Sequence, residues 1–236
     1  MKPLVSICML TIDRYQLTKF CLDELINKSG IDRDEIELLI LDNGSVDKRT
    51  IDLGIQNAEV HIAEPKNIGV SKGFNKLFKE SSGKYICTVG NDISVQNNWL
   101  KDLISYQEKI KNSGISAIYC LLDKGKYNSN LNVYIPQSGL VYGNAIWNRN
   151  LFEKIGYFDE NLSGYGCEDS QYCYRAFATG HINYYVPNQY STHLGEDLNE
   201  DSEYRKLKDT NLKLNQKKLY ESLMKMKAKN NYKIIK

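Results

Sequence analysis

Residues 85–95, YICTVGNDISV, hold the feature from which the fold of this chain can be read. Tyr85–Val89 is a short apolar run of the kind that forms a buried strand. The run stops at Gly90-Asn91-Asp92, where an amide and a carboxylate follow one another. Such a cluster is either a surface turn or part of a cation site, because turns and hard cations both use amide and carboxylate oxygens.

Strands and helices alternate through the first half of the chain. Buried strands are predicted at Leu4–Leu10, Glu37–Leu41 and Tyr85–Val89, and a short strand at Glu59–Ala63. Helices are predicted at Tyr15–Asn27, Asp47–Gln56 and Val70–Ser81. This alternation predicts an α/β fold with an open, mostly parallel sheet flanked by helices.

The second half is less regular. Helices are predicted at Trp99–Ile110, Asn148–Ile155 and Glu168–Thr179, and strands at Ile115–Leu121, Val133–Val141 and His181–Val186. Pro187 is expected to end the last strand, and a long basic helix is expected from about Asp201 as a C-terminal extension.

Polar clusters follow three of the predicted strands. They are Thr11-Ile12-Asp13, Asp42-Asn43-Gly44 and Gly90-Asn91-Asp92. In an open parallel sheet, ligands bind outside the carboxyl ends of the strands. One such cluster is more simply explained as a turn, but three together predict a cleft.

The composition indicates the cellular compartment in which the protein works. The chain has 236 residues, a net charge of +2 and six cysteines without C-x-x-C spacing. Cysteines beside apolar runs behave as small hydrophobic residues, which suits a reducing compartment better than a disulfide framework. The N-terminus has no signal-peptide pattern, and no apolar run is long enough to span a bilayer. These features predict a cytoplasmic protein.

The C-terminal segment is basic. Arg205 to Lys236 contains eleven Lys and Arg against two acidic residues, so the rest of the chain is net acidic, which argues against nucleic-acid binding. One side of the predicted helix carries Leu212, Leu219, Leu223 and Met226. This side either makes a peripheral contact with an anionic membrane or packs on the body of the protein with the lysines in solvent.

In combination, these motifs resemble the family 2 glycosyltransferases, whose fold is called GT-A, over roughly residues 4–195. Val5-Ser6-Ile7 with Thr11-Ile12-Asp13-Arg14 resembles the opening strand and nucleotide-binding turn. Leu41-Asp42-Asn43-Gly44-Ser45 resembles the second strand and turn, and Asn67-Ile68-Gly69 the next loop. Gly156-Tyr157-Phe158-Asp159-Glu160 followed by Glu168-Asp169 resembles the acceptor-side signature.

The resemblance implies an organisation. A GT-A domain is expected over residues 1–200, with a nucleotide-binding half at about 1–95 and an acceptor half at about 96–200. Residues 201–236 then form a basic helical tail.

The resemblance also implies an inverting hexosyl- or deoxyhexosyltransferase that uses a UDP-, dTDP- or GDP-sugar. The implied acceptor is a hydroxyl on a glycan, lipid-linked or protein-linked saccharide, as in polysaccharide biosynthesis. The residues implied to bind the nucleotide sugar are Thr11, Asp13, Arg14, Asp42, Asn67, Gly69, Gly73, Asn91 and Asp92. Structural alternatives exist: Asp42 in an Asx turn, and Asn67–Gly73 as a capped helix start.

A divalent cation, Mn or Mg, is implied at Asp92. Family members usually carry Asp-x-Asp where this chain has Gly90-Asn91-Asp92, so one carboxylate is missing. His193 stands where many members place a late histidine and is the candidate second ligand, and an imidazole favours Mn over Mg. The alternatives are a structural His193 and a weakly metal-dependent enzyme.

Glu168 and Asp169 follow the Gly-rich stretch Ser163–Gly166. By resemblance one of them is the catalytic base, and Asp169 is the candidate, while Asp159 and Glu160 shape the loop. As the structural alternative, an acidic residue stabilises the first turn of a helix by about 0.3–1 kcal/mol. Four aromatic residues either stack on sugars or pack in the core: Tyr142, Trp147, Tyr157 and Tyr165.

Two rival classes share this architecture. A sugar-nucleotide pyrophosphorylase normally has a Gly-rich basic signature after the first strand, and Leu10–Arg14 has no glycine. A non-catalytic nucleotide- or glycan-binding module with a degenerate site is the stronger rival. The incomplete Gly90-Asn91-Asp92 motif favours it, and the presence of Glu168, Asp169 and His193 opposes it.

Overall fold

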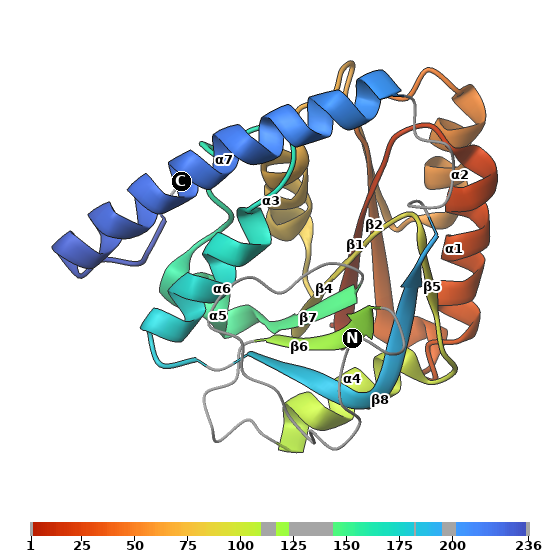
Figure 1. Cartoon of the computed structure of the whole chain (residues 1–236). Helices are drawn as coiled ribbons and strands as arrows, with labels where there is room; N and C mark the ends of the chain where they lie inside the picture. The colour runs from red at the N-terminus through yellow and green to blue at the C-terminus, as the bar shows by residue number, and fades with distance from the viewer. Residues whose placement is uncertain (1, 110–116, 123–143, 182, 195–201, 235–236) are drawn as a thin grey trace.

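The computed structural model describes residues 2–109, 117–122, 144–181, 183–194 and 202–234. Their strands form one eight-stranded sheet in the order β3-β2-β1-β4-β7-β6-β8-β5, with helices on both faces (Figure 1). Four of the seven strand pairings are parallel. The prediction of an open, mostly parallel α/β sheet is confirmed.

The first half of the chain builds the all-parallel part of the sheet. Its elements are β1 (Val5–Thr11), α1 (Tyr15–Asn27), a 3-10 turn at Arg33–Glu35, β2 (Ile36–Asp42), α2 (Lys48–Asn57), β3 (Val60–Ala63), α3 (Val70–Glu80) and β4 (Tyr85–Val89). β1 pairs with β2 on one side and β4 on the other. Each predicted strand and helix of this half is confirmed. β1, β2 and β4 have strong apolar patterns and are mostly buried. β3, at the end of the sheet, is half-buried.

The second half adds the antiparallel pairings. Its elements are β5 (Ile93–Val95), α4 (Trp99–Lys109), β6 (Ala117–Leu122), β7 (Asn144–Asn148), α5 (Arg149–Ile155), α6 (Glu168–Ala178), β8 (Asn183–His193) and α7 (Ser202–Lys229). β7 lies antiparallel between β4 and β6, and β5 lies antiparallel to β8. The sequence pattern does not predict β5 or β7. The strand predicted at Val133–Val141 lies outside the described residues.

The prediction that Pro187 ends the last strand is wrong. β8 continues through Pro187 to His193. Its first part pairs with β6 in one register, and Tyr190 resumes the pairing in another. A proline is tolerated where the hydrogen-bond ladder is interrupted, so Pro187 falls in the irregular stretch without ending the strand. The continuation carries His193 to β5.

Two apolar cores lie on the two faces of the sheet. One contains Leu22 and Leu25 of α1 with Trp99 and Leu103 of α4. The other contains Phe78 of α3, Phe152 of α5 and Tyr172 of α6. Trp147 belongs to this second core, with its ring centroid 4.8 Å from that of Tyr172, so core packing accounts for it. Tyr142 lies outside the described residues.

The described cysteine side chains are buried thiols: Cys8, Cys21, Cys87, Cys167 and Cys173. Burial raises the pKa of Cys21 to about 12. A neutral thiol in an apolar environment packs as a small hydrophobic residue, as the sequence predicts.

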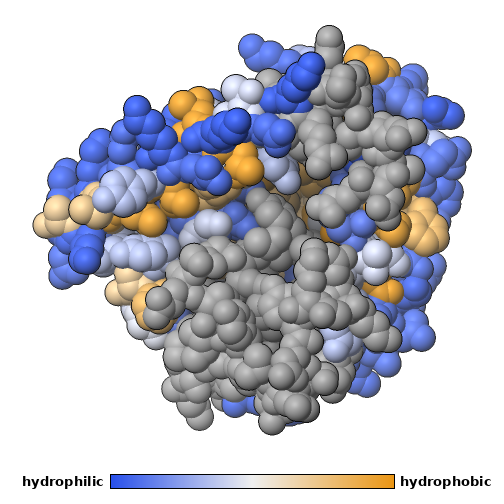
Figure 2. Space-filling view, viewed as in Figure 1, coloured by the Kyte–Doolittle hydropathy of each residue, from blue (hydrophilic) through white to orange (hydrophobic). Residues whose placement is uncertain are grey.

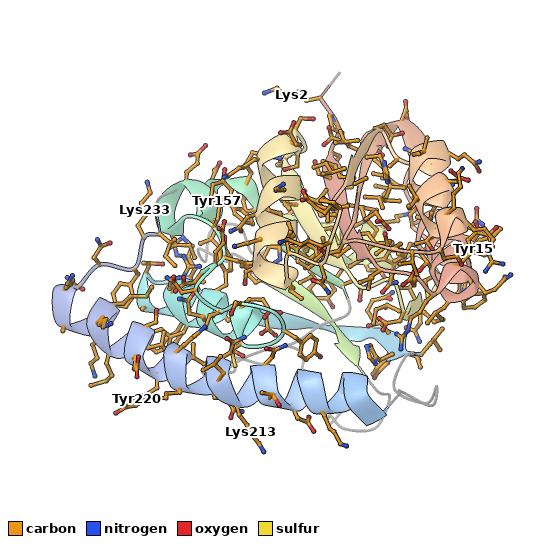
Figure 3. The ribbon with its side chains drawn as sticks, turned by 90° about the horizontal axis from the view of Figure 1, so that it is seen from above. Lys2, Tyr15, Tyr157, Lys213, Tyr220 and Lys233 are labelled. Atoms are coloured by element: carbon orange, nitrogen blue, oxygen red, sulfur yellow. The ribbon has the colours of Figure 1, made fainter. Side chains whose placement is uncertain are left out.

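The helix α7 lies along α6 at the C-terminal end of the chain (Figure 1). Leu212, Leu219, Leu223 and Met226 are half-buried. Lys213 and Tyr220 point away from the body (Figure 3), and orange apolar patches lie among the blue polar surface of this helix (Figure 2). The half-buried apolar side matches the packed alternative, and contact with a membrane stays a prediction. No helix in the described part of the chain has the length and apolar character to cross a membrane.

Candidate active site

Three polar segments meet at one edge of the sheet. Thr11 and Asp42 lie opposite each other at the ends of β1 and β2, and the Asn43 amide donates to the Thr11 carbonyl at 2.7 Å. β4, on the other side of β1, ends directly before Gly90-Asn91-Asp92. The three polar clusters of the sequence therefore follow three adjacent parallel strands.

The turn after β1 is held in an uncommon conformation. Asp13 and Arg14 have φ values of 47° and 57°, a region that non-glycine residues rarely occupy and that recurs at functional sites. The Asp13 carboxylate accepts the amides of Val46 and Asp47, both at 2.8 Å, and its own amide donates to the Ser45 hydroxyl at 2.7 Å. These bonds tie the turn after β1 to the turn after β2.

Asp42 is buried and forms the Asx turn that the sequence offers as its structural alternative. One carboxylate oxygen accepts the amides of Gly44 and Ser45 at 3.2 and 2.9 Å, and the other accepts the Ser45 hydroxyl. A carboxylate accepts about four hydrogen bonds, so the Asx turn orients Asp42 and leaves capacity to accept a further hydrogen bond. Thr11 is buried as well, and its hydroxyl has no hydrogen-bond partner among the described residues.

A pair of asparagines joins the β2 turn to the next loop. The side-chain Nδ2 of Asn43 donates to Oδ1 of Asn67 at 3.2 Å. The side-chain Oδ1 of Asn43 accepts the backbone amide of Ile68 at 2.9 Å. Asn67 also accepts the Gly69 amide at 2.8 Å. Sequence reasoning selects Asn67 but misses Asn43, whose only signal is its place in a turn motif.

Gly69 allows the loop before α3 to approach the backbone of Gly164. Its φ is 86°, and a Cβ atom at Gly69 would lie 2.9 Å from the Gly164 nitrogen. The Val70 amide donates to the Gly164 carbonyl at 2.9 Å. The loop before α3 is therefore in backbone contact with the Ser163–Gly166 loop, which leads to Glu168 and Asp169.

We expect Gly69→Ala to lower the free energy of unfolding by about 2–3 kcal/mol. The alanine would be strained at φ 86° and ψ 166°, a region that is essentially restricted to glycine, by about 1–3 kcal/mol, and would also push on the Gly164 backbone. Gly180→Ala is the control for positive φ without a contact, because Gly180 has a φ of 82° and an added Cβ atom there would meet no described atom within 4 Å. Urea unfolding of both variants separates the two effects, and equal losses would refute the importance of the contact with Gly164.

Two residues selected as sugar-nucleotide ligands make structural contacts. A Cβ atom at Gly73, in α3, would come within 2.8 Å of the Leu10 side chain, so this glycine allows α3 to pack closely on β1. The Asn91 side chain donates to the Thr18 hydroxyl of α1 at 2.9 Å. A role for Gly73 or Asn91 in donor binding stays a prediction.

Asp92 lies beside the second residue selected as a cation ligand. Its Oδ2 atom is 3.3 Å from Nε2 of His193 and 3.4 Å from Nη1 of Arg14. β5 and β8 produce this arrangement, since Ile93 pairs with His193 and the Leu194 amide donates to the Asp92 carbonyl at 2.8 Å. All three side chains are partly exposed, so a ligand can reach them.

The Asp92–His193 pair has donor atoms that suit one cation. Adjacent ligands of an octahedral ion with bonds of 2.0–2.1 Å are about 3 Å apart, close to the separation of this oxygen and nitrogen. Within the described ranges, no group of three His, Cys, Asp or Glu residues forms a ready metal site. An ion held here by Asp92 and His193 would complete its shell with phosphate oxygens and water.

Glu168 and Asp169 are both buried at the start of α6. Cys167, directly before them, has a φ of 75° and is another non-glycine residue in the left-handed region near this edge. Burial, with added contributions from Asp169 and Glu168, raises the pKa of Cys167 to about 11. The thiol is therefore protonated at neutral pH and is not a nucleophile beside the two carboxylates.

Arg175 anchors α6 from its buried side. Its guanidinium donates to the carbonyls of Ile155 and Tyr157, and to the Gln171 side chain at 3.0 Å. Burial lowers the pKa of Arg175 to about 10, which still leaves the group charged at neutral pH. An arginine inside a predicted helix carries no sequence signal for this role.

Asp159 and Glu160 shape the loop before α6. Asp159 accepts the Asn161 amide and the Gln171 side chain, each at 3.0 Å, and the Ser222 hydroxyl of α7 at 3.3 Å. Glu160 accepts the Asn75 side chain at 3.0 Å. These contacts agree with the structural role that the sequence assigns to both residues.

Comparison with known proteins gives one family. The sequence model of the family described as "Glycosyl transferase family 2" matches residues 6–179. No curated protein sequence matches the chain.

Several solved structures resemble the fold. A mannosyltransferase, PcManGT from Pyrobaculum calidifontis, in complex with GDP-Man and Mn²⁺, has a TM-score of 0.69 and 17% identity, covering 84% of this chain and 59% of that one. GalNAc-T7 with UDP, GalNAc and Mn²⁺ has a TM-score of 0.67 and 14% identity, covering 81% and 44%. TarS 1-349 of S. aureus in complex with UDP-GlcNAc has a TM-score of 0.63 and 17% identity, covering 83% and 61%. The chain thus spans 44% to 61% of these proteins, which share its fold.

Proposed function

This chain belongs to glycosyl transferase family 2, and from that premise we propose that it transfers a sugar from a nucleoside-diphosphate donor to an acceptor hydroxyl, with inversion at the anomeric carbon. The observation that carries the proposal is the Asp92 carboxylate 3.3 Å from the His193 imidazole and 3.4 Å from the Arg14 guanidinium. These groups adjoin the polar turns that follow β1, β2 and β4, where a donor binds in an open parallel sheet.

The donor is a UDP-, dTDP- or GDP-sugar. Asp42, oriented by its Asx turn, accepts a hydrogen bond from the base, and Thr11 and Asp13 flank the base and ribose. Asn67 and Gly69 lie at the start of α3 and face the phosphates or the sugar. The Gly69 amide already donates to Asn67, so the attraction comes from the positive end of the helix dipole. The relatives solved with GDP-Man, with UDP and GalNAc, and with UDP-GlcNAc support this class of donor.

Asp169 is the base of the reaction. Its carboxylate accepts the proton of the acceptor hydroxyl while the hydroxyl oxygen forms a bond to the anomeric carbon. The bond from that carbon to the diphosphate oxygen breaks at the same time, and the diphosphate leaves with the electron pair. Glu168 lies beside Asp169 in the same buried turn. One displacement of this kind inverts the configuration.

The leaving diphosphate gains negative charge, and positive charge near Asp92 would stabilise it. Asp92 and His193 would hold a divalent cation, with Mn favoured over Mg by the imidazole ligand. Such a cation, when bound, neutralises charge on the diphosphate. Arg14 contributes a second positive charge at the same carboxylate and supports the alternative of weak metal dependence.

The acceptor is a hydroxyl on a glycan, a lipid-linked or a protein-linked saccharide. The rival function is a non-catalytic module that binds the nucleotide or glycan. The single carboxylate of Gly90-Asn91-Asp92 favours this rival. The buried Glu168 and Asp169 favour the enzyme, because a binding module gains nothing from two adjacent carboxylates that must be held out of water.

A panel of nucleoside diphosphates and nucleotide sugars tests the proposal. We expect the matching nucleotide to stabilise the protein by about 2.7 kcal/mol at 100 times its Kd. For a chain of this size, that corresponds to a rise of about 5–10 °C in Tm. Release of nucleoside diphosphate from the stabilising donor then separates enzyme from binding module. A module would bind without turnover, and stabilisation by no member of the panel would remove the proposal.

A further inference from the structure

We propose that Asn215, in the middle of α7, is a positioning residue that holds the Ser163–Gly166 loop and so places the proposed base. Asn215 is fully buried. Its side-chain amide nitrogen lies 2.9 Å from the Ser163 carbonyl and 3.0 Å from the carbonyls of both Tyr165 and Gly166. The inference rests on the proposed function, in which Asp169 accepts the proton of the acceptor.

The three carbonyls decide how this amide is oriented. The nitrogen carries two N–H groups and satisfies three acceptors, so one bond is shared. The Asn215 oxygen has no hydrogen-bond partner in the described part of the chain. Turning the amide around would set that oxygen against three carbonyl oxygens, so the residue is present for its donors.

The Ser163–Gly166 loop depends on contacts from other segments to hold its conformation. Gly164 and Gly166 have φ values of 77° and 91°, and glycine supplies no side chain to hold such a loop. Cys167 follows with a φ of 75°, and Glu168 and Asp169 come next. A shift of the loop would therefore move the two carboxylates directly.

Both sides of the loop are in contact. On one side Val70 of α3 donates to the Gly164 carbonyl at 2.9 Å. On the other side Asn211 and Leu212 of α7 stand so close that a Cβ atom at Gly164 or Gly166 would come within 2.9 Å of them. Asn215 supplies the hydrogen bonds at the centre of this contact. The loop thus lies between the donor-side helix start and α7.

The position of Asn215 on the helix also sets it apart. Leu212, Leu219 and Met226 share the inner side of α7, where an apolar residue would continue the pattern. Asparagine is a weaker helix former than leucine, because its side chain competes for backbone hydrogen bonds. Its presence on the buried side is explained by the three loop carbonyls.

The test compares Asn215→Asp with Gln216→Ala in the full chain. The aspartate has the same shape but no donor, whereas Gln216 is an exposed amide on the next residue. For Asn215→Asp we expect kcat for transfer to fall about 10–100-fold, because small displacements of a catalytic group carry losses of this order. The KM for the donor should change less than kcat, because the turns after β1, β2 and β4 are not altered and, of the proposed donor-binding segments, the one at Gly69 contacts the loop. Gln216→Ala should match the wild type in both.

Hydrogen–deuterium exchange of amides 163–169 provides the second readout. We expect faster exchange in Asn215→Asp and no change in Gln216→Ala. If Asn215→Asp does not fold, Asn215→Ser keeps one donor in a smaller side chain and should show an intermediate kcat. A folded variant with wild-type kcat and exchange overturns the proposal. If the wild type itself transfers no sugar, the proposed function fails, and the exchange rates alone then support or overturn the clamp.

Discussion

Asp169→Asn is expected to lower the turnover number for sugar transfer by about 10²–10⁴-fold, the usual contribution of a positioned general base. The amide has nearly the same shape as the carboxylate but does not accept a proton from the acceptor hydroxyl. Its oxygen can keep the 2.7 Å bond that Asp169 accepts from the Ser170 amide, so the first turn of α6 should persist. Initial rates at saturating donor, with the donor Kd measured separately, give the result: slow transfer with unchanged Kd.

Glu168→Gln is the matched control for this substitution. Glu168 is the adjacent residue, also buried and in the same helical turn, so both variants replace one carboxyl group by an amide at nearly the same place. A small effect of Glu168→Gln beside a large effect of Asp169→Asn identifies the base. The reverse order would transfer the role to Glu168, and near wild-type turnover in Asp169→Asn would contradict the mechanism.

The edge of the sheet could be predicted from sequence because its strands are strongly patterned. Apolar runs ending at Thr11, Asp42 and Val89 indicate parallel strands, and parallel strands end on the same side. The polar turns therefore had to meet, and Asn43 and Asp13 bind the neighbouring turns as a consequence. Local pattern and global topology agree in this half of the chain.

The approach of His193 to Asp92 could not be predicted by the same reasoning. It depends on β5, which has three residues, and on a β8 that continues past Pro187. A strand this short carries too little periodic signal, and a proline normally argues against a strand. Only the resemblance to a family paired the two residues.

The role of α7 could not be predicted from the sequence either. Its leucines indicate that one side is apolar, and this pattern is the same for a helix that packs on a protein and one that lies on a membrane. Nothing local says that Asn215 meets the Ser163–Gly166 loop, because that contact joins segments about 50 residues apart in the chain. Contacts of this kind are set by tertiary packing.

Asp92→Ala is expected to reduce kcat/KM for the donor by about 10²–10³-fold, the size of effect seen when one preorganised group that stabilises developing charge is removed. It should also abolish the response of the rate to added Mn²⁺, because His193 alone offers one protein ligand. The measurement is a titration of transfer rate with Mn²⁺ for wild type and variant. Asp52→Ala, which removes an exposed carboxylate paired with Lys48, should leave the titration unchanged.

Arg14→Ala decides between the two ways of neutralising the diphosphate. The same carboxylate oxygen of Asp92 lies near both His193 and Arg14. Removing Asp92 therefore has one consequence if a cation neutralises the diphosphate and the opposite consequence if Arg14 does. If a cation carries the charge, Asp92→Ala is the severe substitution and Arg14→Ala is the milder one. If Arg14 carries it, removing Asp92 releases the guanidinium toward the phosphates, Arg14→Ala becomes severe, and neither rate depends on Mn²⁺. The second pattern would overturn the assignment of Asp92 and His193 as metal ligands, because a group that serves only to restrain an arginine does not respond to the ion.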